Sequence, residues 1–198
     1  NDPRFAPAGV LAPKSKADLA FTMHMLSWLS TDGTAAIVEF PGVLYRGGKE
    51  GKIRKYLISN NFVDTVIQLP ENLFFGVAIA TCIIVLKKSK ADSNILFIDA
   101  SKEFIHEGNK NKVSDENITH IYNLVDKREQ VEHLTALVSN DDVLNNGSNL
   151  SVSSYVEPED TTEKIDIKVL NKQISDIVKK EESLRIAIDK IVSELEED

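Results

Sequence analysis

The stretch Val63–Lys88, VDTVIQLPENLFFGVAIATCIIVLKK, carries most of the information about the fold. It contains two short apolar runs, Val63–Leu69 and Ala80–Leu86, that have the length and the β-branched composition of buried strands. A Pro-Glu-Asn sequence, typical of turns, follows the first run. The stretch therefore predicts two strands joined by a loop.

This loop contains Leu73-Phe74-Phe75-Gly76. Two neighbouring aromatic side chains are costly to expose to water, so they either fill the core or form a platform for a flat ligand such as a base. Adjacent side chains of an extended segment point in opposite directions, so we expect one ring to stack and one to pack. Phe75 is the preferred stacking ring, because Gly76 lets a ligand approach closely.

The preceding residues predict alternating helices and strands. A capping box of Ser15 and Asp18 predicts a helix that runs to about Ser30. The apolar run Thr34–Phe40 is typical of a parallel strand covered on both faces, and a helix is expected at about 52–59. The order helix, strand, helix, strand, strand resembles the second half of a doubly wound α/β sheet that closes with an antiparallel hairpin.

Further along the chain, the pattern predicts a strand at 95–99, a helix capped by Ser114, a short helix starting at Ser139 and an extended segment at 149–156. From about residue 166 a heptad repeat begins, which indicates a long helix that needs a partner helix. Only Glu181 interrupts its apolar seam. The seam consists of Leu170, Ile174, Ile177, Leu184, Ile188, Ile191 and Leu195.

The composition of the 198 residues, 42% of them hydrophobic, allows a real core. No apolar run is long enough to cross a bilayer, and no signal-peptide pattern is present. The chain begins with Asn, which suggests a portion of a longer protein. The single Cys82 lies in an apolar run, so we expect a buried thiol and a cytoplasmic location. The four histidines have no metal-site spacing with it, and no metal site is expected.

The net charge of −8 is unevenly distributed along the chain. Residues 1–90 have 11 Lys/Arg and 7 Asp/Glu (+4), residues 91–156 have 5 and 11 (−6), and residues 157–198 have 7 and 13 (−6). The basic excess is greatest at Arg46, Lys49, Lys52, Arg54 and Lys55. This cluster either meets a phosphate backbone or is the solvated face of a helix.

Several motifs together resemble a known family. They are ADLAFTMHMLSWL, GTAAIVEFPGVLYRGGKEGKIRKYLI, the opening stretch, NILFIDAS and NLSVSSYV, and they cover nearly all of residues 4–156. In order and spacing they are similar to the modification (M) subunit of type I restriction-modification systems, an S-adenosylmethionine-dependent DNA adenine-N6 methyltransferase. The resemblance implies the back half of a Rossmann-like class I methyltransferase sheet, ending in an antiparallel hairpin, plus a helical C-terminal tail.

The resemblance also implies roles for individual residues. Phe74 or Phe75 would stack on a flipped target adenine. Asp18 and Phe21 are candidates for the border of the cofactor pocket, and helix capping and core packing explain them as well. The segment 41–51, with Arg46 and the Gly47-Gly48 pair, either touches the DNA backbone or is an ordinary flexible connector. The candidate DNA contacts are Arg46, Lys49 and Lys52. The heptad would bind the DNA-specificity subunit, and the complex would also hold DNA, a second modification subunit and a restriction subunit.

Two motifs of the family do not occur in this sequence: the glycine-containing cofactor loop and the catalytic Asn-Pro-Pro-aromatic tetrapeptide. The resemblance implies that both lie upstream, so these 198 residues alone are expected to bind no S-adenosylmethionine and to have no catalytic residue and no methylation activity. Ala80 stands where the family commonly has proline, and Ser154 where arginine is frequent. These departures put the turn into the second strand and the role of that arginine in doubt.

The sequence predicts three regions: 1–104 as the back half of the catalytic domain, 105–160 as a helical and extended connection, and 161–198 as the coiled-coil-like tail. With the front strands missing, 34–40 becomes a sheet edge that another copy or the front half covers. Self-association through that edge or the tail is therefore expected. The alternative function is a non-catalytic assembly or nucleic-acid-binding module with a Rossmann-like core.

Overall fold

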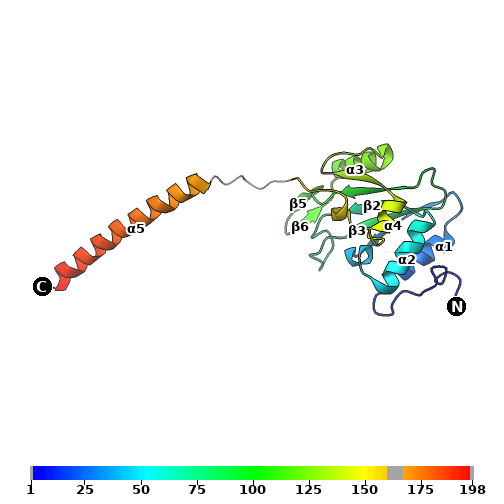
Figure 1. The fold of residues 1–198 in the computed structure, drawn as a ribbon, viewed down its shortest axis with the longest axis horizontal. Coiled ribbons are helices and arrows are strands. Elements are labelled where there is room, and N and C mark those ends of the chain that lie inside the picture. Colours follow the sequence, from blue (N-terminus) through cyan, green and yellow to red (C-terminus); the bar gives the residue numbers. More distant parts are fainter. Residues whose placement is uncertain (1, 160–166, 197–198) are drawn as a thin grey trace. The chain divides into compact units, whose positions relative to one another are not determined.

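A five-stranded sheet organises residues 1–159, which form one of the two compact units of the computed structural model; residues 160–198 form the other (Figure 1). The structure describes residues 2–159 and 167–196. The strand order is β1-β3-β2-β4-β7. These strands are β1 (Thr34–Glu39), β2 (Val63–Gln68), β3 (Cys82–Lys87), β4 (Asn94–Asp99) and β7 (Thr135–Ser139).

The predicted strand pair of the opening stretch is confirmed as an antiparallel hairpin. Val66 of β2 lies opposite Ile84 of β3, and the register shifts once, between Val63 and Thr65. β2 pairs in parallel with β4, and β4 pairs antiparallel with β7. The result is a mixed α/β unit in which the hairpin lies inside the sheet.

For residues 34–40, the expected strand and its place at the sheet edge are confirmed, but the expected parallel pairing and the burial of both faces are wrong. β1 lies at the sheet edge, as expected, but it pairs antiparallel with β3 rather than in parallel with a neighbour. Its side chains alternate, with Ala36 and Val38 exposed and Glu39 buried. An almost continuous apolar run cannot show which face is covered, because that depends on how far the covering helices reach.

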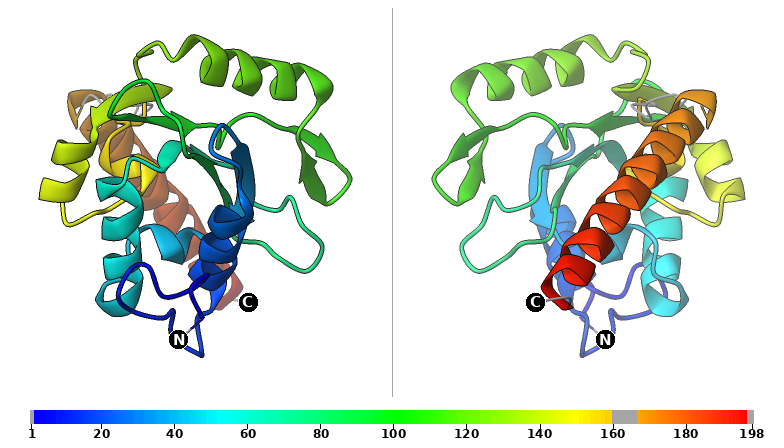
Figure 2. Two further views of the ribbon diagram at one scale, coloured as in Figure 1. Left: turned by 90° about the vertical axis from the view of Figure 1, so that its right-hand side faces the viewer. Right: turned by 90° about the vertical axis from the view of Figure 1, so that its left-hand side faces the viewer.

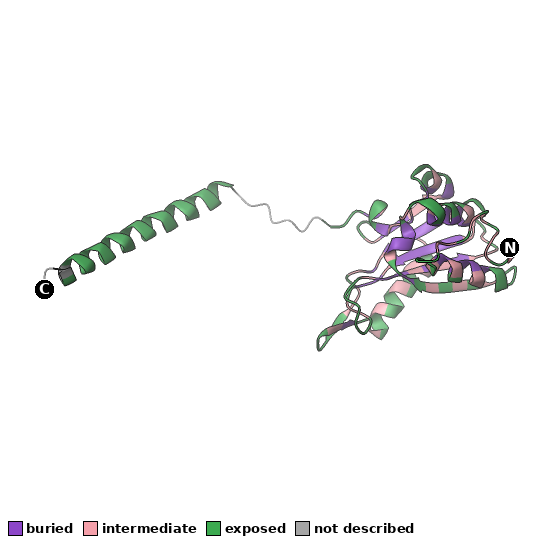
Figure 3. Ribbon diagram, turned by 90° about the horizontal axis from the view of Figure 1, so that it is seen from below, coloured by how far each residue is buried: buried purple, intermediate pink, exposed green. Residues whose placement is uncertain are grey.

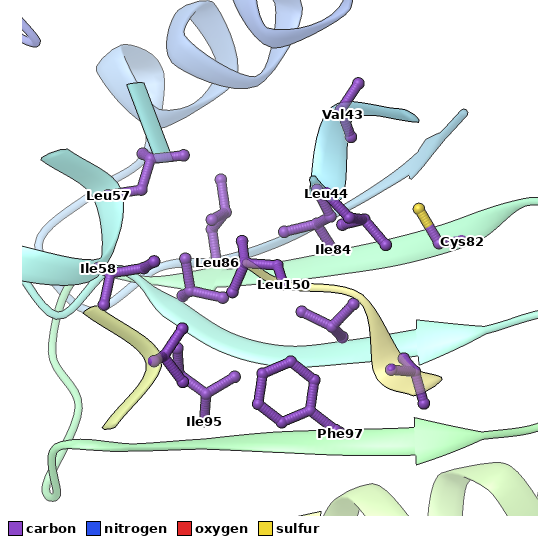
Figure 4. Packing of buried hydrophobic residues seen from close by; sticks show 14 of the residues in the cluster. Val43, Leu44, Leu57, Ile58, Cys82, Ile84, Leu86, Ile95, Phe97 and Leu150 are labelled. Atoms are coloured by element: carbon purple, nitrogen blue, oxygen red, sulfur yellow. The ribbon is translucent and has the colours of Figure 1, made fainter. Parts of the chain in front are cut away.

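Helices cover the two faces of the sheet unequally (Figure 2). α1 (Asp18–Trp28) and α2 (Gly48–Ser59) pack on one face together with α4 (Asn140–Asn145), and α3 (Asp115–Lys127) lies on the other. The larger core, on the α1 and α2 side, includes Leu57, Ile84 and Phe97 (Figure 4). The smaller core, under α3, includes Ile67 and Ile98 but no residue of β1.

Helix caps test several predictions. Ser114 and Ser139 cap α3 and α4, as expected, each accepting a backbone hydrogen bond. The predicted cap at Ser15 is wrong: α1 begins at Asp18, with Ala17 at the N-cap and no side-chain bond. α2 begins four residues before the expected start, at Gly48, whose φ of +67° suits glycine.

Residues 105–159 of the predicted connecting region belong to the first unit. β7 adds a strand to the sheet, and β5 (Ile105–Glu107) pairs with β6 (Lys110–Lys112) in a separate hairpin. The segment expected to be extended at 149–156 includes a 3-10 turn, η2 (Val152–Ser154), which accompanies the earlier turn η1 (Pro41–Leu44). The predicted connecting region therefore shares its sheet and core with residues 1–104.

The second unit contains α5 (Ile167–Glu196), an uninterrupted helix of 30 residues. The seam side chains predicted from the heptad are exposed along it (Figure 3). Of the helices in the described part of the chain, none is both long enough and apolar enough to span a membrane.

Candidate functional site

The carboxyl ends of three strands that run in the same direction lie at the same edge of the sheet. β1 ends at Glu39, β2 at Gln68 and β4 at Asp99. Gln68 pairs with Asp99, and both Glu39 and Gln68 lie opposite Cys82 at the start of β3. Ligands of open α/β sheets bind at such an edge, so the residues around it form the candidate site.

The aromatic loop, defined as residues 69–81, leaves the sheet at this edge. The Phe75 side chain is 95% exposed and that of Phe74 is 44% exposed. The interpretation that both rings fill the core below the loop is therefore wrong. Gly76, with a φ of +73°, makes the turn at the tip, and the Val77 N–H donates to the Phe74 carbonyl at 3.2 Å.

The base of the aromatic loop is closed by hydrogen bonds. The Leu69 N–H donates to the Thr81 carbonyl at 2.9 Å, and the Gln68 Nε2 donates to the carbonyls of Leu69 and Thr81, each at 3.3 Å. Leu69 itself is buried in the smaller core. The loop thus has a fixed base and an outer tip that presents Phe75.

The β5–β6 hairpin supports the loop from the side, which sequence reasoning missed. The Lys110 Nζ donates to the Phe74 carbonyl at 2.7 Å and lies 5.0 Å from the centre of the Phe75 ring. The buried Asn111 donates to Glu71 O through Nδ2 at 2.9 Å and to Asn72 O through its backbone N–H at 3.2 Å. The available signal was Gly108-Asn109, a turn signal between two tripeptides that are too short to show a strand pattern.

The basic cluster of the sequence separates into two groups. Arg54 is buried, at 2% exposure, and donates to Ser148 O and Val43 O at 2.8 and 2.9 Å. Arg46 donates to the buried Glu50 at 3.2 Å, and its guanidinium lies 5.6 Å from the Phe40 ring centre. In contrast, Lys49, Lys52 and Lys55 are exposed on α2. The two arginines are held by the fold, whereas the three lysines are open to a partner.

A buried carboxyl group lies at the end of β1. Glu39 Oε1 accepts a hydrogen bond from the Thr22 hydroxyl at 2.9 Å. Burial raises the pKa of Glu39, with the Thr22 bond lowering it and the nearby Asp18 charge raising it further. Burial also raises the pKa of the Cys82 thiol to about 12, so this cysteine is an inert core residue, as predicted.

The predicted cofactor-border residues both lie on α1, near this carboxyl group. The Asp18 side chain is half-buried, and its charge reaches Glu39. The Phe21 ring is largely exposed.

The histidines do not converge on a common site: His120 Nδ1 lies 2.9 Å from Glu103, and His133 Nδ1 lies 3.0 Å from the Glu157 carbonyl. Residues 2–159 and 167–196 contain no cluster of three or more ligands suited to a metal ion.

Comparisons with known proteins place these features in context. Residues 1–164 match the family model described as N-6 DNA Methylase. The chain is 47% identical over 199 aligned residues to the Type I restriction enzyme MpnII methylase subunit of Mycoplasma pneumoniae, covering 100% of this chain and 37% of the relative. It is 33% identical to the MjaVII methylase subunit of Methanocaldococcus jannaschii, covering 95% of this chain and 33% of that protein.

Solved structures give a consistent result. The methyltransferase subunit of the type I restriction-modification system from Streptococcus thermophilus matches with a TM-score of 0.77 and 46% identity. That match covers 79% of this chain and 34% of the other. The chain spans about a third of the length of these relatives. The resemblance inferred from the motifs is therefore confirmed.

Proposed function

The chain belongs to the N-6 DNA methylase family, and we propose from this premise that it forms the target-base side of an adenine-N6 DNA methyltransferase. In this proposal the first unit is the back half of a Rossmann-like class I methyltransferase sheet. The complete protein is the methylase subunit of a cytoplasmic type I restriction-modification complex. The 198 residues alone are inactive, because the cofactor loop and the Asn-Pro-Pro-aromatic motif do not occur among them.

The exposed Phe75 ring at the carboxyl edge of the sheet is the observation that carries the proposal. An enzyme that modifies a base must hold the flipped base flat, and an aromatic ring stacked against it contributes about 1–3 kcal/mol. The aromatic loop offers such a ring on a fixed base. Phe74 is less exposed and serves as the neighbour that shapes the loop tip.

DNA backbone contacts are assigned to the start of α2. Lys49 and Lys52 are exposed and can neutralise phosphates. Arg46 is bound to Glu50 and lies against Phe40, so its contribution is to shape the surface beside the lysines and to add positive charge. These contacts position the duplex and carry no base sequence information, which agrees with a separate specificity subunit.

S-adenosylmethionine is the cofactor proposed for the complete enzyme, and it would supply the methyl group. The residues present here do not fit it as a complete site. Asp18 and Phe21 lie on one helix, and Phe21 is largely open to solvent. They form at most one border of a pocket whose remaining walls come from elsewhere in the complete protein.

The tail has an assembly role in this proposal. Along α5, the exposed side chains of Leu170, Ile177 and Leu184 belong to an apolar seam. Helical seams of this kind bind other helices. We assign the seam to the specificity subunit, with the second modification subunit and the restriction subunit completing the assembly.

The test is Phe75→Ala in the complete methylase subunit, assembled with its specificity subunit. Loss of about 1–3 kcal/mol of stacking lowers the rate of adenine methylation by about 5- to 150-fold, with S-adenosylmethionine binding unchanged. Tyr122→Ala, which removes an exposed aromatic ring from α3, is the matched control and retains the wild-type rate. Unchanged turnover in Phe75→Ala contradicts the proposed role of this ring.

A further inference from the structure

The geometry points to the β5–β6 hairpin as the positioning device for the aromatic loop, with Lys110 as the residue that holds the loop tip. This inference rests on the proposed function, because it concerns how Phe75 is presented to the target base. It assigns a role to residues that belong to no recognised motif of the sequence. We propose that Lys110 is a positioning residue and makes no contact with the reacting atoms.

Three contacts tie the hairpin to the loop at separate points. Asn111 binds the ascending part of the loop through the carbonyls of Glu71 and Asn72. Lys110 binds the tip through the Phe74 carbonyl at 2.7 Å. Asn111 is 9% exposed and its Nδ2 bond is part-buried, whereas the Lys110 bond is solvent-exposed and charge-assisted.

The loop tip combines two left-handed residues with an almost unpacked ring. Asn72 has a φ of +57°, a left-handed conformation, and Gly76 has a φ of +73°. Between them, the Phe75 side chain is 95% exposed and receives almost no packing from the rest of the unit. A ring without packing samples many orientations unless its backbone is fixed, and the bonds from Lys110 and Asn111 supply that restraint.

Lys110 also affects which orientation the ring adopts. Its ammonium lies 5.0 Å from the centre of the Phe75 ring, within the range of cation–π attraction. The Phe75 side chain remains 95% exposed, so the ammonium covers little of the ring. The contact therefore biases the orientation of the Phe75 ring and leaves its surface free for stacking on a base. The same ammonium therefore restrains both the backbone before Phe75 and the ring itself.

The test uses the complete methylase subunit with its specificity subunit and compares three variants. Lys110→Met removes the ammonium and keeps the aliphatic stem, and Lys110→Arg keeps a cationic donor. Lys112→Met removes an equal charge from the same strand, where Lys112 pairs with Glu107 at 3.3 Å and not with the loop. The readouts are kcat and KM for methylation and hydrogen exchange of the loop amides without DNA.

For Lys110→Met we expect exchange of the Val77 amide, which donates to the Phe74 carbonyl, to rise about 5- to 10-fold and kcat to fall by about the same factor, with KM for DNA within twofold of wild type. Lys110→Arg should restore both quantities, and Lys112→Met should match wild type. Unchanged loop exchange in Lys110→Met overturns the inference, as does an equal loss of kcat in Lys112→Met. A wild-type protein that does not methylate DNA rejects the proposed function instead, while the exchange comparison still decides whether Lys110 holds the loop.

Discussion

Arg54→Met is a substitution for which the structure predicts a large loss of stability. The guanidinium is 2% exposed and joins three parts of the chain. It extends from α2, donates to Val43 O in η1 and donates to Ser148 O, 94 residues further along the chain. Methionine retains the length of the side chain but removes both hydrogen bonds and the buried positive charge.

The magnitude follows from what the substitution leaves behind. Two backbone carbonyls lose a charged donor, each at a cost of about 1–3 kcal/mol. Glu50 is 3% exposed, and its charge favours the protonated guanidinium of Arg54. In Arg54→Met that attraction is lost, and the salt bridge between Glu50 and Arg46 remains. Removing one partner from a buried charged network costs about 3–5 kcal/mol, so we expect a loss of this size from a typical total of about 5–15 kcal/mol.

Urea unfolding followed by near-ultraviolet circular dichroism measures the effect, because all Phe, Tyr and Trp residues of the sequence lie in the first unit and α5 contributes no aromatic signal. Lys55→Met, an exposed cation on the same helix, is the control and should change the unfolding free energy by less than about 0.5 kcal/mol. Adding Glu50→Gln to Arg54→Met should recover at least about 1 kcal/mol. A loss below about 1 kcal/mol in Arg54→Met would refute the reasoning.

Two further predictions concern the site. Phe75→Ala should change the free energy of unfolding by less than about 0.5 kcal/mol because the ring is exposed, whereas Phe97→Ala, in the core, should cost about 3–5 kcal/mol in the same urea assay; similar losses would show that Phe75 packs. Glu39→Gln should raise Tm at about pH 8 relative to wild type. The folded-state pKa of Glu39 is raised, so its stabilising contribution is present below the unfolded pKa and is lost as pH rises through the folded pKa. Gln keeps the Thr22 bond and avoids that loss, so the Tm difference should shrink toward about pH 4; a lower Tm for the variant at pH 8 contradicts this assignment.

The sequence predicted the elements whose signals are local. The two runs that became β2 and β3, the caps at Ser114 and Ser139 and the heptad of α5 each depend on neighbouring residues. The neighbours of β1 were not predictable in this way, because its partner β3 begins more than 40 residues later and the reach of α3 decides which face is covered. Composition alone could not separate the buried Arg54 from the exposed Lys52.

In the candidate site, too, features with local signals were predictable and features that depend on long-range contacts were not. Phe74 and Phe75 were identifiable because two aromatic residues beside a glycine are unusual in a loop. Lys110 and Asn111 were not, since the tripeptides of β5 and β6 are too short for a strand pattern, and the contacts of these two residues with the loop span 36 to 40 residues. Long-range contacts of isolated polar residues leave no periodic signal in a sequence.

The position of β3 between β1 and β2 determines the order in which the sheet can assemble during synthesis. β1 and β2 are not paired with each other in this sheet, so a nascent chain that ends before Cys82 carries two strands without a ladder between them. Both ladders become available only when the ribosome has released the chain as far as Lys87. Until then, β1 and β2 lack the partner strand that this sheet gives them, and strands with open backbone groups are prone to aggregation.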